Sequence, residues 1–231
     1  MVARFAPRRA LVRRGLGMTI ARRIAILLLL LGGLAAAMPA GFAAVQPTSP
    51  EQAAAFITDI GNRVIKVLAN HGLAPAQRDA RVKALLDEGL DLAAIGRFAL
   101  GPAGRTATPE QRSEYDKLFH DYVLTSYARR FSAYSGETFK VTSAQPIAGS
   151  DALVLTQVTR PSGEIVNVDW RVRDEDGHMK ILDVLIEGVS LVVTQRQEFA
   201  AVEQNKGIDG LLQSMRQQIK AFESGAGAPS Q

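Results

Sequence analysis

The chain has 231 residues, 47% of them hydrophobic, and a formal net charge of +4. This positive charge lies at the N-terminus, because seven of the 27 basic residues precede residue 45 and all 23 acidic residues follow residue 50. The remainder therefore has 20 basic and 23 acidic residues, a net charge of −3, which argues against a nucleic-acid-binding protein. Cysteine is absent, which excludes disulfides, thiolate metal sites and a cysteine nucleophile.

Residues 1–44 have the pattern of an export signal. Arginines precede an apolar run at 24–37, and small residues suited to signal peptidase follow it. We expect cleavage after Ala43 or Ala44, and translation to begin at Met18, where a conventional signal opens. A retained membrane anchor is the alternative, since the run approaches the roughly 20 residues that span a bilayer; its glycines and proline favour cleavage. We predict a soluble periplasmic protein, exported by the Sec route.

Four helices are predicted in the first half of the remaining chain. The first begins at Ser49-Pro50 and ends near Gly72, the second follows Pro75, and the third covers residues 91–100. The fourth begins at Thr108, whose hydroxyl can cap the helix ahead of a proline. It runs to residue 131 with an aromatic-rich apolar stripe: Tyr115, Leu118, Phe119, Tyr122, Val123, Ser126, Tyr127 and Phe131. Such a stripe is typical of core packing, and a ligand-facing role is the alternative.

The period changes to two after residue 136, which indicates strands. The clearest alternation covers residues 166–173, and residues 179–193 form the last apolar run. A final helix is predicted from about Thr194, with a break near Gly207 and a disordered tail at 224–231. Helices, a meander and a helix predict one α+β domain over residues 45–223, in which helices cover an antiparallel sheet of about four strands.

Few residues could carry catalysis or bind a metal. The three histidines, His71, His120 and His178, lack metal-ligand spacing. Asp183 and Glu187 could form an acid/base pair, but without a histidine or metal partner we expect them to form ion pairs with arginines at the sheet rim. The candidate arginines are Arg97, Arg105, Arg129, Arg130 and Arg171. We therefore expect no enzyme, no catalytic residue, no cofactor and no metal; the basic and aromatic run at 127–131 could bind an anionic head group.

The run DVLIEGVSLVVTQRQEF at 183–199 resembles the signature of the MlaC family, periplasmic phospholipid-binding proteins also described as toluene-tolerance or ABC-transporter auxiliary components. The resemblance continues through DLAAIGRFALG at 91–101, TATPEQRSEYDKLFHDYVLTSYARRFSAYSGETF at 106–139 and GIDGLLQSMRQQI at 207–219. It covers about residues 51–222. Gly104-Arg105 departs from the pattern, since relatives often have a tryptophan there, and any contact made by such a ring is in doubt.

The resemblance implies a helix-covered sheet related to the NTF2-like fold, with a deep apolar cavity that holds the two acyl chains of a phospholipid. It implies a carrier between an outer-membrane lipoprotein–porin complex and an inner-membrane ABC transporter with an MCE-domain protein, which maintains outer-membrane lipid asymmetry. A hopanoid ligand and a non-catalytic adaptor remain open as alternatives. The residues expected to line the cavity are Leu85, Ile95, Phe98, Phe119, Val123, Tyr127, Val168, Trp170, Val184 and Ile186. Gly188 would allow a bulge or bend in the last strand.

Overall fold

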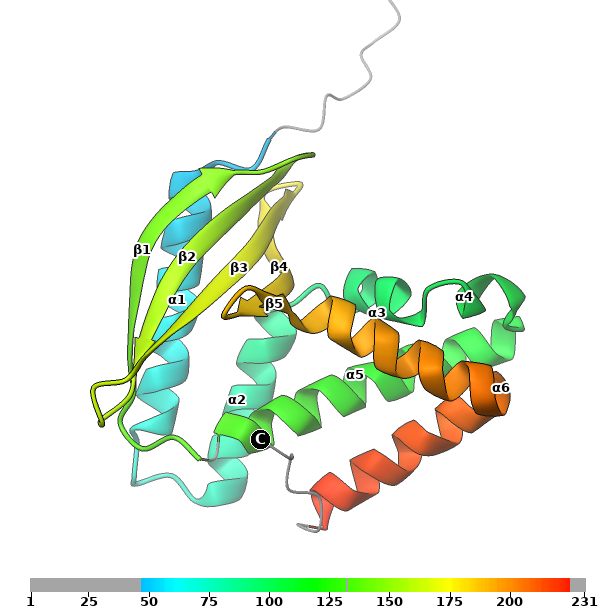
Figure 1. Cartoon of the computed structure of the whole chain (residues 1–231). Coiled ribbons are helices and arrows are strands. Elements are labelled where there is room, and N and C mark those ends of the chain that lie inside the picture. Colours follow the sequence, from blue (N-terminus) through cyan, green and yellow to red (C-terminus); the bar gives the residue numbers. More distant parts are fainter. Residues whose placement is uncertain (1–46, 132, 225–231) are drawn as a thin grey trace, which may run out of the picture. The chain divides into compact units, whose positions relative to one another are not determined.

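The computed structural model describes residues 47–131 and 133–224. The predicted signal peptide at 1–44, its start at Met18 and the tail beyond residue 224 lie outside the described residues. The elements in chain order are α1 (Pro50–Leu68), α2 (Pro75–Gly89), α3 (Leu92–Leu100), α4 (Ala103–Thr106), α5 (Pro109–Phe131), β1 (Thr138–Pro146), β2 (Asp151–Thr159), β3 (Ile165–Glu175), β4 (His178–Ile186), β5 (Val189–Ser190) and α6 (Leu191–Glu223) (Figure 1). The predicted α+β class is confirmed, because the strands form one antiparallel sheet packed against helices.

Side-chain caps explain where several helices begin. The Ser49 hydroxyl accepts a hydrogen bond from the first turn of α1, and the Asp91 carboxylate does the same for α3. At the start of α5, Thr108 and Gln111 cap each other: the Thr108 N–H donates to Gln111 Oε1 at 2.9 Å, and the Gln111 N–H donates to Thr108 Oγ1 at 3.2 Å. This reciprocal cap satisfies two donors that the helix itself leaves without partners.

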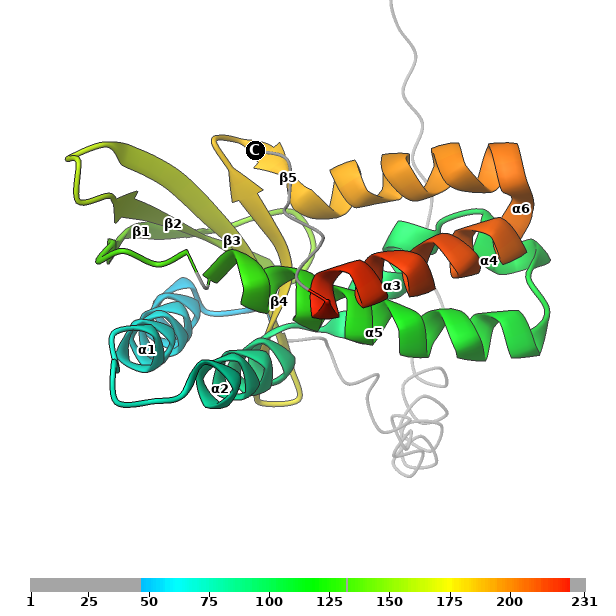
Figure 2. The ribbon, with the colours of Figure 1, turned by 90° about the horizontal axis from the view of Figure 1, so that it is seen from below.

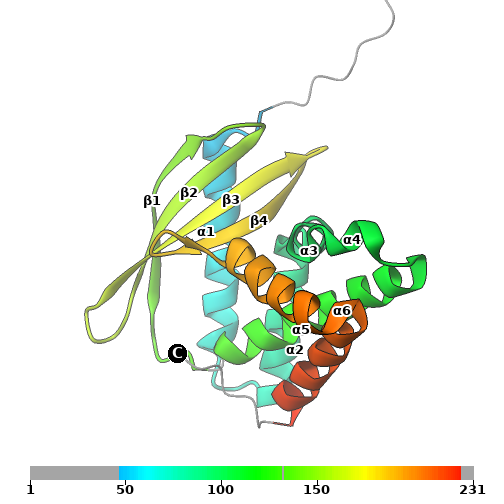
Figure 3. The same cartoon turned by 45° about the vertical axis from the view of Figure 1, so that its right-hand side comes forward.

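The last helix begins earlier than predicted and is broken where predicted. Ser190 caps α6 by accepting a hydrogen bond from the Val193 N–H at 3.0 Å, so the helix begins at Leu191 and not at Thr194. Gly207 interrupts it with φ 66° and ψ −179°, a conformation open essentially only to glycine. The two halves of α6 consequently point in different directions (Figure 3).

The sheet has five strands in the order β1-β2-β3-β4-β5, one more than the four predicted. The additional strand, β5, is only two residues long and follows a two-residue turn at Glu187 and Gly188, both with positive φ. Gly188 therefore belongs to a tight turn, and the bulge or bend expected there is a hairpin reversal.

The buried apolar side chains form three separate clusters. The sheet cluster joins α1 to one face of the sheet, on the side where Figure 2 shows α1, and consists of Ala53, Ile57, Ala152, Val154, Val172 and Ile181. The α1–α2 cluster also contains Ala128 from the C-terminal part of α5. Its members are Ile60, Val64, Leu68, Val82, Leu85 and Ala128. The helix cluster joins α3, α4, α5 and both halves of α6 and consists of Ile95, Ala99, Leu100, Ala103, Tyr115, Phe119, Val123, Phe199, Leu211, Leu212 and Met215.

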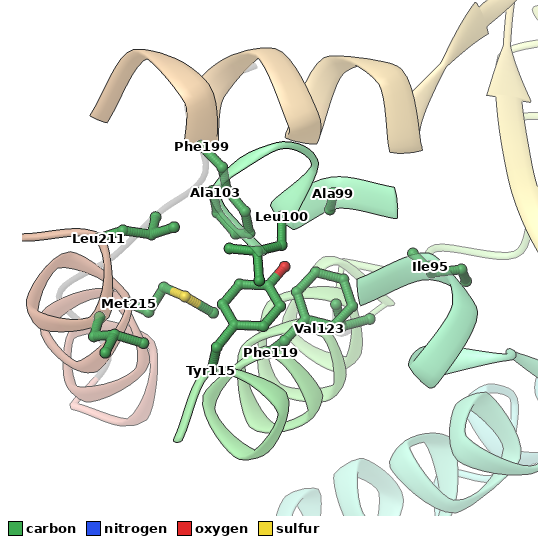
Figure 4. Close-up of a cluster of buried hydrophobic side chains, with 11 residues drawn as sticks. Ile95, Ala99, Leu100, Ala103, Tyr115, Phe119, Val123, Phe199, Leu211 and Met215 are labelled. Atoms are coloured by element: carbon green, nitrogen blue, oxygen red, sulfur yellow. The ribbon is translucent and has the colours of Figure 1, made fainter. Parts of the chain in front are cut away.

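Aromatic contacts organise the helix cluster. Tyr115 stacks on Phe119 with ring centroids 5.6 Å apart, and Phe199 from α6 meets both rings edge-on. Figure 4 shows Leu211 and Met215 from the second half of α6 approaching the same rings. The Tyr115 hydroxyl donates to the Gly96 carbonyl at 2.9 Å, so the one polar group among these rings is satisfied.

A buried carboxylate holds the beginning of β2. The Asp151 side chain is fully buried and accepts hydrogen bonds from Arg171 Nε at 2.5 Å and Arg173 Nε at 2.7 Å. Burial raises the pKa of Asp151, but the hydrogen bonds from Arg173 and Arg171 outweigh it and leave the pKa below its ordinary value. Thr48 joins the chain to this end of the sheet, because its hydroxyl accepts from the Asp174 N–H at 2.8 Å.

Candidate functional site

The ten residues predicted to line a cavity are distributed over all three clusters and beyond them. Leu85 belongs to the α1–α2 cluster; Ile95, Phe119 and Val123 belong to the helix cluster, against which Tyr127 packs; Trp170 and Val184 pack against the sheet cluster. Val168 is buried outside the three clusters, whereas Phe98 and Ile186 are exposed. Eight of the ten are thus buried or partly buried, and two are exposed.

The joins are made by side chains that are only partly buried. Phe56 packs against both the sheet cluster and the α1–α2 cluster, and Leu90 packs against both the sheet cluster and the helix cluster. We call the seam these two residues together with three partly buried neighbours that each pack against one cluster: Tyr127 against the helix cluster, and Trp170 and Val184 against the sheet cluster. A domain of this size usually has one contiguous core. This core is instead divided into three clusters, and Phe56 and Leu90 bridge neighbouring clusters.

From the seam an apolar surface follows β4 to the outside, and we call it the ramp: Ile181, Val184, Ile186 and Val189. The first three lie opposite Val172, Trp170 and Val168 of β3, which alternate and so share one face of the sheet; Val189 lies opposite Ile186. Exposure rises along the ramp from 3% at Ile181 to 38% at Ile186 and 59% at Val189. An apolar path thus leads from the sheet cluster to solvent.

The tryptophan beside the ramp is held in a fixed orientation. Trp170 Nε1 donates to the Thr156 hydroxyl at 3.0 Å, and that hydroxyl donates to the Val168 carbonyl at 2.5 Å. The Phe139 ring meets the Trp170 ring edge-on, with centroids 6.4 Å apart. The indole can therefore present apolar carbon to the seam, because its one polar group is satisfied.

Neither of two hollows in the described residues lies between the sheet and the helices. One is an open depression on α5, lined by Pro109, Glu110, Ser113, Glu114 and Lys117. The other is a cleft of about 40 Å³ that involves both halves of α6, lined by Gln195, Glu198, Phe199, Val202, Leu211, Ser214, Met215 and Gln218. Pockets for small-molecule ligands measure about 300–1,000 Å³. The cleft in α6 is far smaller than such a pocket.

Asp183 caps the last helix. Its Oδ2 accepts from the Ser190 hydroxyl at 2.6 Å, and its Oδ1 accepts from the Val192 N–H at 3.2 Å. The carboxylate thus joins β4 to the N-terminus of α6, where the helix dipole favours negative charge. The predicted ion pair with an arginine is wrong for the described residues. Arg171 lies opposite Asp183 in the sheet, but its guanidinium binds the buried Asp151 instead.

Glu187 closes the turn between β4 and β5. Its Oε1 accepts from the Asn167 N–H at 2.6 Å, and its own N–H donates to the Asn167 carbonyl at 3.0 Å. These bonds hold a non-glycine residue at φ 48°. The arginine partner predicted for Glu187 is likewise not found in the part of the chain that the structure describes. Both acids of the signature run therefore have structural roles.

The basic and aromatic run at the end of α5 has two different contacts. Arg129 Nη1 donates to the Phe222 carbonyl at 2.9 Å, which joins α5 to the end of α6. The Arg130 guanidinium lies 5.1 Å from the centre of the Tyr127 ring. Burial raises the pKa of Tyr127, so its phenol stays protonated at neutral pH.

The described residues contain neither a candidate metal site nor a membrane-spanning helix. Within residues 47–131 and 133–224, no three His, Asp or Glu side chains are placed to hold a metal ion together. None of the helices in the same ranges combines the length and hydropathy needed to cross a bilayer.

These features define a class of protein: an α+β domain in which helices cover a curved antiparallel meander and an apolar interior reaches the surface along one strand. The family model described as MlaC protein matches residues 58–217, and the chain belongs to the MlaC family. The resemblance of the signature run is thereby confirmed.

Two curated relatives support this assignment. The chain is 22% identical over 132 residues to the intermembrane phospholipid transport system binding protein MlaC of Haemophilus influenzae, covering 55% of this chain and 62% of the relative. It is 27% identical over 105 residues to the toluene tolerance protein ttg2D of Pseudomonas putida, covering 46% of this chain and 49% of the relative. The chain thus spans about half to three fifths of the length of these relatives.

A solved structure shares the fold. The phospholipid-binding protein from Ralstonia solanacearum, determined in complex with a phospholipid, superposes with a TM-score of 0.64 at 23% sequence identity. The match covers 74% of this chain and 98% of that one.

Proposed function

We propose that the chain is a periplasmic phospholipid carrier, and that the lipid enters along the ramp and places its acyl chains in the seam. The observation that carries this proposal is the ramp, an apolar path from a divided core to solvent in a member of the MlaC family. The relatives support it, since one is described as a phospholipid transport system binding protein and the Ralstonia protein was solved with a phospholipid.

In this proposal the seam opens when lipid is loaded. Trp170, Val184 and Tyr127 would exchange their present packing contacts for contacts with acyl chains, so most of the apolar surface would stay out of water. Each methylene removed from water contributes about 0.8 kcal/mol, so two chains with roughly 30 methylenes amount to about 24 kcal/mol. A bilayer offers nearly the same stabilisation. Transfer is therefore close to neutral, and its direction must come from partners.

The partners in this proposal are those that the family implies. An outer-membrane lipoprotein–porin complex would exchange lipid with the carrier on one side. An inner-membrane ABC transporter with an MCE-domain protein would do so on the other, and its ATPase would set the direction. The export pattern of residues 1–44 supports a periplasmic location, and the result would be maintenance of outer-membrane lipid asymmetry.

Native mass spectrometry tests the proposal. The exported protein is purified from periplasm without detergent, and the released ligand is fragmented. We expect one diacyl phospholipid per chain. A hopanoid would retain the carrier function with another lipid class, and a stable chain that never contains lipid would contradict it and favour an adaptor.

A further inference from the structure

Thr156 is a polar side chain buried on the face of the sheet that carries the sheet cluster. It is 1% exposed, shares this face of β2 with Val154 and Val158, and lies opposite Val168 of β3. A buried hydroxyl among valines is unfavourable unless it is hydrogen-bonded. This hydroxyl is used both ways, since it accepts from Trp170 Nε1 at 3.0 Å and donates to the Val168 carbonyl at 2.5 Å.

The bond to Thr156 fixes the direction in which the indole points. In the sheet, Trp170 lies opposite Val154 of β2 on one side and opposite Val184 of β4 on the other. Because its Nε1 is bonded to a residue of β2, the ring leans over β2 and away from β4. The largest side chain on this face is thereby kept off the ramp at Val184.

Phe139 of β1 stops the indole on the side away from the ramp. The two rings meet edge-on with centroids 6.4 Å apart. Phe139 is backed in turn by α1, because a Cβ atom at Gly61 would lie only 2.7 Å from Phe139 Cε1. A ring released from Thr156 is therefore blocked toward β1, and the open direction is toward β4, where Val184 is partly buried and Ile186 is 38% exposed.

The indole N–H gives a released ring a reason to move. Without the Thr156 hydroxyl this donor would be left among valines, and a buried donor without a partner is unfavourable. A change of the Trp170 χ1 angle between staggered wells would carry the ring toward the ramp, whose exposed end gives the N–H access to water. There the ring would cover Val184 and Ile186, the surface along which the proposed function places an entering acyl chain.

We propose that Thr156 is a positioning residue for lipid binding, which holds the Trp170 indole over β2 and so keeps the ramp open to an acyl chain. This role rests on the proposed function and adds the side chain that controls access to its site. Lipid would have to displace an indole that lay on the ramp. The apparent affinity for lipid would then fall with the fraction of molecules whose ramp is open.

A double-mutant cycle tests this role. The mature chain is incubated with a limiting amount of phosphatidylcholine vesicles and separated from them, and native mass spectrometry measures the lipid it retains. We expect Thr156→Val to lower the retained lipid at least about fivefold, because its buried indole N–H has lost its acceptor, and Thr156→Ser to retain lipid like the unmodified chain. The Trp170→Phe variant has no such N–H, so adding Thr156→Val to it should change the retained lipid little.

Fluorescence reports the position of the indole directly, since Trp170 is the only tryptophan of the chain. In the chain stripped of lipid, Thr156→Val should shift the emission to longer wavelength as the ring moves toward water. The matched control is Thr125→Val, which removes a buried hydroxyl of α5 that accepts from Lys83 Nζ at 3.1 Å. That variant should change neither the emission nor the retained lipid.

Circular dichroism melting checks that each variant is folded, and Thr156→Ala replaces Thr156→Val if the latter does not fold. Unchanged emission or unchanged lipid retention in Thr156→Val would overturn the positioning role and leave the carrier function intact. An equal loss of lipid with and without Trp170→Phe would also overturn it, because Thr156 would then act on the fold and not through the indole. An unmodified chain that retains no lipid would contradict the carrier function, and the positioning role with it.

Discussion

Replacement of Asp183 by alanine tests the role of the first acid in the signature run. Its carboxylate accepts one hydrogen bond from Ser190 and one from the Val192 N–H at the beginning of α6. Hydrogen bonds to a charged group contribute about 1.5–3 kcal/mol each, and a carboxylate at a helix N-terminus adds about 0.3–1 kcal/mol. The Ser190 hydroxyl can bond to water instead, so we expect Asp183→Ala to lower the free energy of unfolding by about 2–4 kcal/mol.

Equilibrium unfolding in urea measures this loss. Trp170, the only tryptophan of the chain, lies in the seam and reports the transition by fluorescence. Asp183→Asn keeps one acceptor oxygen without the charge and should lose about half as much. Asp116→Ala removes an exposed acid of α5 and should stay within about 0.5 kcal/mol of the unmodified chain.

An Asp183→Ala chain that unfolds at the same urea concentration, with the same dependence on urea, would refute the capping role. If that variant also failed to retain lipid, Asp183 would have to be reassigned to ligand binding.

Three further substitutions follow from the structure. The Asp151→Asn variant should have a lower free energy of unfolding at neutral pH. That free energy should also fall less between pH 7 and pH 3 than in the unmodified chain. Burial raises the pKa of Asp151, but hydrogen bonds from two arginines outweigh it and lower the pKa. The contribution of Asp151 to stability is therefore present above the unfolded pKa of about 3.9 and is lost as pH falls through the lower folded pKa. Urea midpoints at pH 7 and pH 3 measure the difference. Val184→Asn should reduce lipid content in native mass spectra, whereas Ile165→Asn, on the other face, should not; equal losses would contradict the ramp. Gly207→Ala should cost about 1–3 kcal/mol, seen as a lower melting temperature, since φ 66° with ψ −179° strains any other residue although the surrounding space is open.

Local signals allowed the sequence to predict most of the elements. The cap at Thr108 and the break at Gly207 depend on a few neighbouring residues, and both were predicted correctly. Alternation along residues 166–173 predicted β3 in the same way, because a strand repeats every two residues. The two residues of β5 are too few to show any period, so the fifth strand was missed.

The seam could not be predicted, because cavity-lining and core-filling side chains have the same chemistry. Only the folded chain shows that Trp170 and Val184 are partly buried beside the sheet cluster while Phe119 is enclosed within the helix cluster. The exposure of Phe98 and Ile186 was missed for the same reason. An apolar residue at helical or strand spacing predicts a buried face, but not whether another element covers it.

The sequence by itself determined the α+β class, the order of helices and strands, and membership in the MlaC family, since all three depend on patterns along the chain. Tertiary structure alone decided the partners of the charged residues. Arg171 of β3 lies opposite Asp183 of the neighbouring strand β4 and could have paired with it, but it pairs with Asp151. Asp151 is buried and has lost its hydration, so it gains more from a cationic partner than the partly exposed Asp183 would. This pairing depends on burial, which cannot be predicted from a local sequence pattern. Asp183 is therefore available to cap α6 at the exposed end of the ramp.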